Sequence, residues 1–146
     1  MARYLNSIFK ADNEPRTAWF DVGASQTINE GDLVVASSGV IVVAAAAATA
    51  IVGIAAASIT TGASPVAGVD RIPVTLVKDA VIRIDYTGTT KTTLAVADKY
   101  GTAFDLGTKR TLNLDDTTGG MLQVIDYNNT NKTADVVILA ANQYLK

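Results

Sequence analysis

The stretch Ala80-Val81-Ile82-Arg83-Ile84-Asp85-Tyr86 decides the fold class, because apolar and charged side chains alternate along it. Successive side chains of a β-strand point to opposite faces, so the four even-numbered residues share one face, whereas Arg83 and Asp85 lie on the other. Lys78 and Asp79 form a turn signal directly before the stretch. The pattern predicts a strand over residues 80–86 with one buried face.

The rest of the chain is divided by turn residues into similar short apolar segments. Val, Ile and Thr together supply 45 of the 146 residues, and these β-branched types favour strands. We therefore expect an all-β protein, a small β-barrel or β-sandwich built from short antiparallel strands. The expected strands are 17–22, 27–28, 33–36, 40–43, 51–55, 71–77, 80–86, 111–115, 121–127 and 135–139. Pro73 has no backbone N–H, so segment 71–77 is expected to be an edge strand or to begin after this residue.

Charge divides the chain into three parts. Residues 1–16 carry three basic and two acidic side chains, residues 17–70 carry four acidic and no basic ones, and residues 71–146 carry nine basic and eight acidic ones. The first part ends in a polar segment whose proline disfavours helix. We expect an extended N-terminal arm, 1–16, joined to a single β domain, 17–146, or to two packed lobes, 17–70 and 71–146.

The chain contains no cysteine and no histidine, which excludes several kinds of chemistry. Thiolate nucleophiles, Ser-His-Asp triads and Cys/His zinc sites cannot form, and the side chain that titrates near neutral pH is missing. Lys and Arg number 12 against 14 Asp and Glu, so the basic surplus of a nucleic-acid binder is absent. We therefore expect a non-enzymatic protein without a cofactor, a metal ion or a nucleic-acid partner.

One uncharged stretch, Val40–Ile59, is long enough to cross a bilayer as a helix. Weakly apolar alanine makes up much of it, and no Lys or Arg lies between Thr17 and Asp70 to orient a membrane span. Two buried strands joined by small residues are the favoured alternative, so no membrane partner is expected. The first residues also lack the apolar segment of a secretory signal.

Acidic pairs are the remaining candidates for catalysis. Asp115 and Asp116 are followed by Thr-Thr-Gly-Gly, a composition typical of a loop, and adjacent strand residues face opposite sides. Asp126, Asn128 and Thr130 supply oxygens at alternating positions, as at the start of a calcium loop, but Asn131 replaces the required Gly and Val137 replaces the closing Glu. A hydrolase that uses carboxylates alone stays open as an alternative, and it requires two acids facing one cleft about 5–9.5 Å apart.

An internal repeat joins Ile84–Thr92 (IDYTGTTKT) and Ile125–Thr133 (IDYNNTNKT). Each copy is expected to be a hairpin, either because two turns converged on the same chemistry or because a unit was duplicated. In both copies we expect the aspartate to approach the lysine across the turn.

Large apolar side chains near the N-terminus are candidates for contact with a partner. Those in the arm are Tyr4, Leu5, Ile8 and Phe9. The arm either inserts into a neighbouring molecule or forms a first strand on its own domain. Trp19 and Phe20 open the β domain, where we expect them in the core, with an interface as the alternative.

Four segments of the first half form a pattern: Thr27–Val35, which contains a Glu-Gly-Asp turn, then Gly39–Val43, Ile51–Ala55 and Ile59–Gly62. With the polar arm before it, this pattern resembles the decoration, or cement, proteins of tailed-bacteriophage heads, and the resemblance covers residues 1–70. It implies a non-enzymatic β-barrel protein that binds the major capsid protein. Such proteins stabilise the outer surface of the virion as homotrimers at three-fold positions, after synthesis in the host cytoplasm.

A second class of function stays open, a carbohydrate-binding or receptor-binding β-domain of a phage or cell surface. Its candidate stacking residues are Trp19, Tyr86, Tyr100 and Tyr127. Aromatic side chains gathered on one exposed face would favour this function, and buried ones would oppose it.

Overall fold

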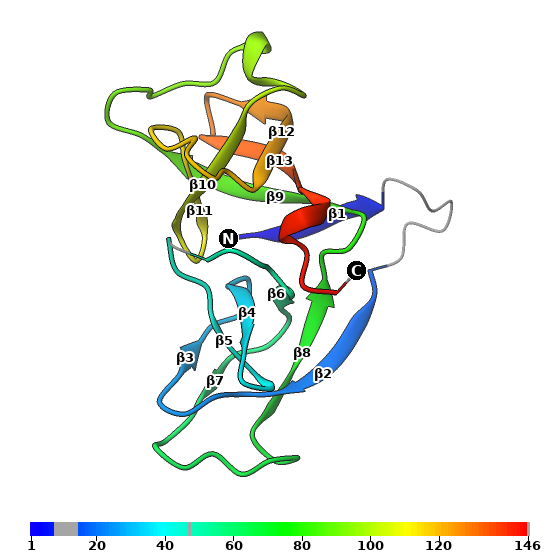
Figure 1. Cartoon of the computed structure of the whole chain (residues 1–146). Helices are drawn as coiled ribbons and strands as arrows, with labels where there is room; N and C mark the ends of the chain where they lie inside the picture. The colour runs from blue at the N-terminus through cyan, green and yellow to red at the C-terminus, as the bar shows by residue number, and fades with distance from the viewer. Residues whose placement is uncertain (8–14, 47, 146) are drawn as a thin grey trace.

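The computed structural model describes residues 1–7, 15–46 and 48–145, and these residues form an all-β protein. Figure 1 shows two lobes, one above the other, with both chain ends between them. The strands and short 3₁₀ helices are β1 (Arg3–Ser7), β2 (Thr17–Asp21), β3 (Thr27–Ile28), β4 (Leu33–Ser37), β5 (Val40–Val43), β6 (Gly53–Ala55), β7 (Ile59–Thr60), β8 (Arg71–Leu76), β9 (Ala80–Thr87), η1 (Val96–Asp98), β10 (Ala103–Thr108), β11 (Thr111–Asn113), β12 (Leu122–Asn128), β13 (Thr133–Ile138) and η2 (Ala140–Asn142). The expected fold class is confirmed.

The upper lobe in Figure 1, here called the upper barrel, contains β1 and β9 to β13. Its strand order is β1-β9-β11-β10-β12-β13, and β9 also pairs with β13, so the sheet closes on itself. Along β9, Ile82 and Ile84 are fully buried and Tyr86 is nearly so, whereas Arg83 lies on the outer face. The alternation predicted for residues 80–86 is therefore confirmed.

The lower lobe, here called the lower barrel, contains β2 to β8. Its main sheet has the order β2-β8-β6-β4-β5, and β3 pairs separately with β7. Val22, directly after β2, pairs with Ile41 of β5, which brings the two edges of the sheet together. The lower barrel has its own apolar core, in which Val34 and Val74 are fully buried.

β10 is a strand that the sequence patterns above do not predict. Phe104 and Leu106 point into the upper barrel and Asp105 does not, so the alternation of a strand is present. Gly107 follows Leu106 directly, so the alternation is too short to predict a strand from the sequence alone. The structure shows that Phe104 and Leu106 share a face.

Both alternatives expected for Pro73 are wrong, because β8 (Arg71–Leu76) lies between β2 and β6 and begins before Pro73. The carbonyl of Pro73 accepts a hydrogen bond of 2.9 Å from the N–H of Ala56, so the backbone at Pro73 faces the β6 side. Ala56 comes directly after β6 ends at Ala55. The nitrogen without a proton therefore lies beyond the paired part of β6, where no regular ladder bond is lost.

The boundary between the lobes also differs from the one expected between Asp70 and Arg71. β8 pairs with β2 and β6 and thus completes the lower barrel, and the chain crosses to the upper barrel at 77–79. At the N-terminus, β1 pairs with β9 of the upper barrel, whereas β2 belongs to the lower one. Two packed lobes are present, and β1 is a strand of the upper barrel.

Among the residues that the structure describes, no helix is both long and apolar enough to span a membrane. The stretch Val40–Ile59 supplies β5, β6 and the first residue of β7 instead.

Candidate interaction surfaces

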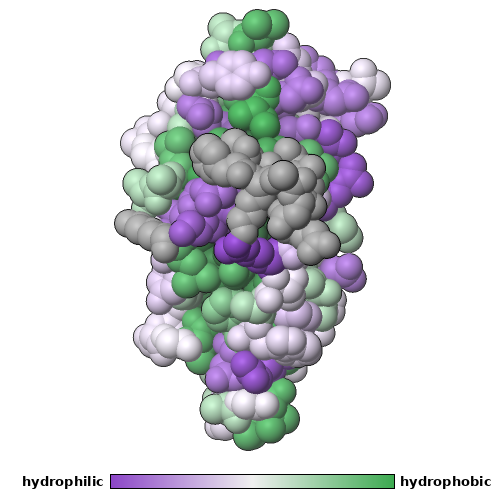
Figure 2. Space-filling model, turned by 90° about the vertical axis from the view of Figure 1, so that its right-hand side faces the viewer, coloured by the Kyte–Doolittle hydropathy of each residue, from purple (hydrophilic) through white to green (hydrophobic). Residues whose placement is uncertain are grey.

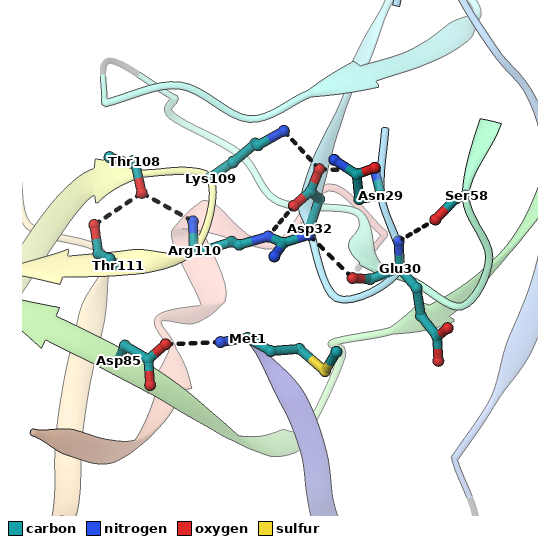
Figure 3. Close-up of polar contacts among 10 residues, drawn as sticks. All are labelled: Met1, Asn29, Glu30, Asp32, Ser58, Asp85, Thr108, Lys109, Arg110 and Thr111. Carbon is teal, nitrogen blue, oxygen red and sulfur yellow. Dashed lines mark hydrogen bonds and ion pairs between the residues drawn. The ribbon is translucent and has the colours of Figure 1, made fainter. Parts of the chain in front are cut away.

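The Glu30-Gly31-Asp32 turn joins the two barrels. Asp32 is fully buried, and its carboxylate accepts hydrogen bonds from Lys109 Nζ at 2.8 Å and from Arg110 Nε, both in the turn between β10 and β11 (Figure 3). Burial alone would raise the pKa of Asp32, but the hydrogen bonds from Lys109, the Asn29 N–H and Arg110 outweigh it and lower the pKa. Asp32 thus stays ionised at the junction between the barrels.

The N-terminus lies at the same junction. The amino group of Met1 lies 2.7 Å from the Asp85 carboxylate of β9 (Figure 3). The N–H of Ala2 donates to the Gly31 carbonyl at 3.2 Å. Gly31 has a φ of +84° and packs against the Met1 side chain, so a side chain at this position would be strained and would collide with Met1. The Glu30-Gly31-Asp32 turn therefore has a structural role, because it connects the N-terminus to the junction between the barrels.

The predicted interface residues fall in different environments. Tyr4 and Leu5 lie in β1 and are half-buried, and Tyr4 packs against the core of the upper barrel. Of the two alternatives for the arm, Arg3–Ser7 therefore follow the second, because they form a strand that pairs within their own domain. Ile8 and Phe9 lie outside the described residues.

Trp19 and Phe20 lie on opposite faces of β2. Phe20 packs against the core of the lower barrel, as expected. Trp19 is 59% exposed, so its expected place in the core is wrong. Successive residues of a strand alternate between faces, and only Phe20 can point inward at this step.

The far end of the lower barrel is apolar and exposed. Val66 and Val69, in the loop before β8, are 57% and 72% exposed, and Figure 2 shows hydrophobic surface at both ends of the molecule. Hydrogen bonds hold this loop: Val66 N–H donates to the Asp70 carboxylate at 2.6 Å, and Gly68 N–H donates to Asp21 at 2.9 Å. The two valines are therefore presented on a fixed loop.

Small uncharged side chains cover much of the lower barrel. No charged residue occurs from Leu33 to Val69, and within this range the exposed positions are mostly Ala, Ser, Gly and Thr. Such side chains lose little rotamer freedom when another protein covers them. Burying this surface therefore costs less side-chain conformational entropy than burying a surface covered by lysine and glutamate.

Asp115 lies in a turn, as its loop composition predicts, and its carboxylate also fastens a second loop. Its carboxylate accepts hydrogen bonds from the N–H groups of Thr89 and Lys91 at 2.5 and 2.7 Å, and also from Thr90 N–H and the Thr89 hydroxyl. These bonds, with that from Lys91 N–H contributing most, hold the pKa of Asp115 far below its ordinary value. The carboxylate is thus occupied in fastening residues 89–91.

Asp126 and Asp135 both line a concavity on the outer face of the upper barrel. They are direct partners across β12 and β13. Asp135 receives two hydrogen bonds from Arg83, and the hydrogen bond from Lys99 Nζ, at 2.6 Å, lowers the pKa of Asp126. A glycosidase needs one carboxyl group whose pKa is raised, and these two carboxylates are paired with cations instead. Within the described residues no cluster of three acidic groups suits a metal ion.

The expected contacts across the two repeat turns are wrong. Asp85 pairs with the Met1 amino group and Asp126 with Lys99, whereas Lys91 pairs with Asp98 at 2.8 Å. Lys132 donates to the Thr92 carbonyl at 2.9 Å.

Only the second repeat copy forms a hairpin, between β12 and β13. In the first copy the chain continues from the end of β9 into the loop that Asp115 fastens, and η1 follows this loop. Similar local sequences therefore adopt different structures because their tertiary partners differ.

The four candidate stacking residues do not form one surface. Tyr86 is buried and donates to Asn129 Oδ1 at 2.6 Å, and Tyr127 is half-buried. Trp19 and Tyr100 are exposed but lie in different barrels. The arrangement opposes an aromatic platform for saccharides made from these residues.

Fold and surfaces together define a protein of two small β-barrels, with exposed apolar residues at both ends of the molecule and a polar concavity on the upper barrel. No protein-family model matches the chain, and no curated protein is significantly similar to it.

Proposed function

We propose that this protein decorates the outer surface of a bacteriophage capsid and stabilises it. The observation that carries the proposal is the exposed apolar end of the lower barrel, formed by Val66 and Val69, on a barrel whose other exposed positions are mostly small and uncharged; Trp19 of β2 is a further exposed apolar residue of the same barrel. Exposed apolar surface of this kind is typical of a protein-binding face.

The support from the sequence lies in the same part of the molecule. The four segments that resemble decoration proteins form β3 to β7 of the lower barrel, together with the turn that joins the barrels. The arm residues Tyr4 and Leu5 lie in the upper barrel. The lower barrel is therefore the part that we assign to the major capsid protein.

A homotrimer at three-fold positions is part of the proposal. Three copies held by the capsid contribute three equal contacts, so modest affinity at each lower barrel gives strong attachment. Light scattering on the purified protein is expected to give a mass of about 46 kDa, three times the 15.2 kDa of one chain. A mass equal to that of one chain, measured on the free protein in detergent-free buffer of low ionic strength, would contradict a preformed trimer.

Attachment itself is tested by co-sedimentation with expanded capsids of the phage that encodes the protein, stripped of surface proteins. We expect the protein to sediment with expanded capsids and to saturate at a fixed number of copies. Protein that stays in the supernatant at every concentration would refute the proposed function.

A further inference from the structure

The concavity on the outer face of the upper barrel has the properties of a ligand site that the proposed function does not use. It has a volume of about 170 Å³ and is formed by β9, β12, β13 and the turn from Asn128 to Thr133. Pockets for drug-sized molecules hold about 300–1,000 Å³, so this one suits a single small ring.

Two ion pairs make the concavity rigid and neutral. Arg83 donates Nε and Nη2 to the two oxygens of Asp135 at 2.6 and 2.8 Å, a bidentate geometry that fixes both side chains. Asp126 is matched by Lys99. Because the charges cancel, neither an anion nor a cation gains net attraction, and a neutral ligand is favoured.

Several polar groups beside these ion pairs are available to a ligand. Asn128 Oδ1 accepts the N–H groups of Thr130 and Asn131 at 3.0 Å each, which orients its side chain. Within the described part of the chain, the side-chain amide of Asn131 and the hydroxyl of Thr133 make no hydrogen bond to protein. Amides and hydroxyls both donate and accept, as the hydroxyls of a sugar ring do.

The threonine-rich groove on the other side of β9 provides a useful contrast. It is lined by residues such as Thr87, Thr108 and Thr111, but its carboxylate, Asp115, is occupied by the loop 89–91. Thr108 and Thr111 are also bonded to each other, at 2.9 Å. The polar groups of this groove are therefore already bonded within the protein, whereas the concavity at Arg83 keeps the Asn131 amide and the Thr133 hydroxyl available to a ligand.

We propose that this concavity, lined by Arg83, Asp126, Tyr127, Asn128, Asn131, Thr133 and Asp135, binds a neutral monosaccharide unit. Planar groups held at fixed positions would meet adjacent ring hydroxyls, and the charged members give the stronger hydrogen bonds. This polar mode of recognition differs from the aromatic platform that the structure opposes. It is independent of the capsid proposal, because the site lies on the upper barrel.

The test is a titration of ¹⁵N-labelled full-length protein with D-glucose, D-galactose, D-mannose and N-acetyl-D-glucosamine, followed by amide chemical shifts. At least one sugar is expected to shift amides of Arg83 and of residues 126–135, with saturation in the millimolar range, about 1–50 mM. No change at these amides with any of the four sugars, or equal changes over both barrels, would overturn the proposal.

Variants locate the binding site. Asn131→Ala and Thr133→Val are each expected to weaken binding at least about tenfold. Thr117→Val, an exposed threonine in a loop away from the concavity, is the matched control and should bind like the unaltered protein. Asn131 lies in an exposed turn, so its variant should keep the dispersed spectrum of the folded barrel. Unchanged binding by this folded variant would also overturn the proposal.

Discussion

Asp32 of the lower barrel is fully buried, and it pairs with Arg110, which lies 78 positions later in the chain, in the β10–β11 turn of the upper barrel. Lys109 adds a second cation, and the carbonyl of the same residue accepts the N–H of Leu33 at 2.9 Å. A buried carboxylate with two cationic partners therefore fixes how the two barrels pack against each other.

Replacing Asp32 should destabilise the whole protein. Asp32→Ala leaves Lys109 and Arg110 without their anion at the junction, and because both are about one-third exposed, we expect a loss of about 2 kcal/mol or more in the free energy of unfolding. Chemical denaturation measures this loss. Glu30→Gln, two residues away and exposed, is the control and should change stability by less than about 0.5 kcal/mol. Equal stability of the two variants would show that the ion pairs do not hold the junction.

The same carboxylate should make stability depend on acid. The pKa of Asp32 is lower in the folded protein than its ordinary value of 3.8, so its contribution is complete above that value and is lost as the pH falls below it. Denaturation midpoints measured between pH 7 and pH 2 should fall less steeply for Asp32→Asn than for the unaltered protein. Parallel curves would contradict this assignment.

Asp115 should control the loop 89–91 without affecting the barrel core. Asp115→Ala removes the acceptor of three backbone N–H groups, so amide hydrogen exchange at Thr89, Thr90 and Lys91 should accelerate at least about tenfold. Exchange at the core strand β9 is expected to stay the same. Asp116→Ala, which removes only a bond from Thr118 N–H, should leave the loop protected. Unchanged exchange in the first variant would mean that the loop is held by other contacts.

Much of the fold follows from local pattern. The alternation along 80–86 and the turn residues around β4 and β5 predict strands that the structure contains. β10 escapes prediction because Gly107 shortens its alternation, and Pro73 misleads because its nitrogen lies past the end of β6. Whether a missing N–H disrupts a sheet depends on the neighbouring strand, which local sequence does not reveal.

The candidate sites are harder to predict, since they depend on contacts between distant segments. The aspartates of the repeat are expected to meet lysines of their own turns, but Asp126 meets Lys99 and Asp85 meets the Met1 amino group. The concavity at Arg83 combines three strands and a turn. Its only signal in the sequence is the run of oxygen-bearing residues from Asp126 to Thr133, and that run does not identify Arg83 or Asp135 as neighbours.

The surface assigned to the capsid is tested by paired charge substitutions at the two ends of the molecule. Val66→Asp and Val69→Asp place a carboxylate on the apolar end of the lower barrel, and Val96→Asp places one at an exposed valine of the upper barrel, where exposure is 76%. All three positions are exposed, so folding should be unaffected, as circular dichroism would verify.

Co-sedimentation of these variants with stripped, expanded capsids is the most direct measurement. We predict that Val66→Asp and Val69→Asp lose at least about tenfold in affinity, because a charge must be desolvated in the contact, while Val96→Asp binds like the unaltered protein. The prediction would be contradicted if Val96→Asp alone lost binding, or if none of the proteins, including the unaltered one, bound to the capsids.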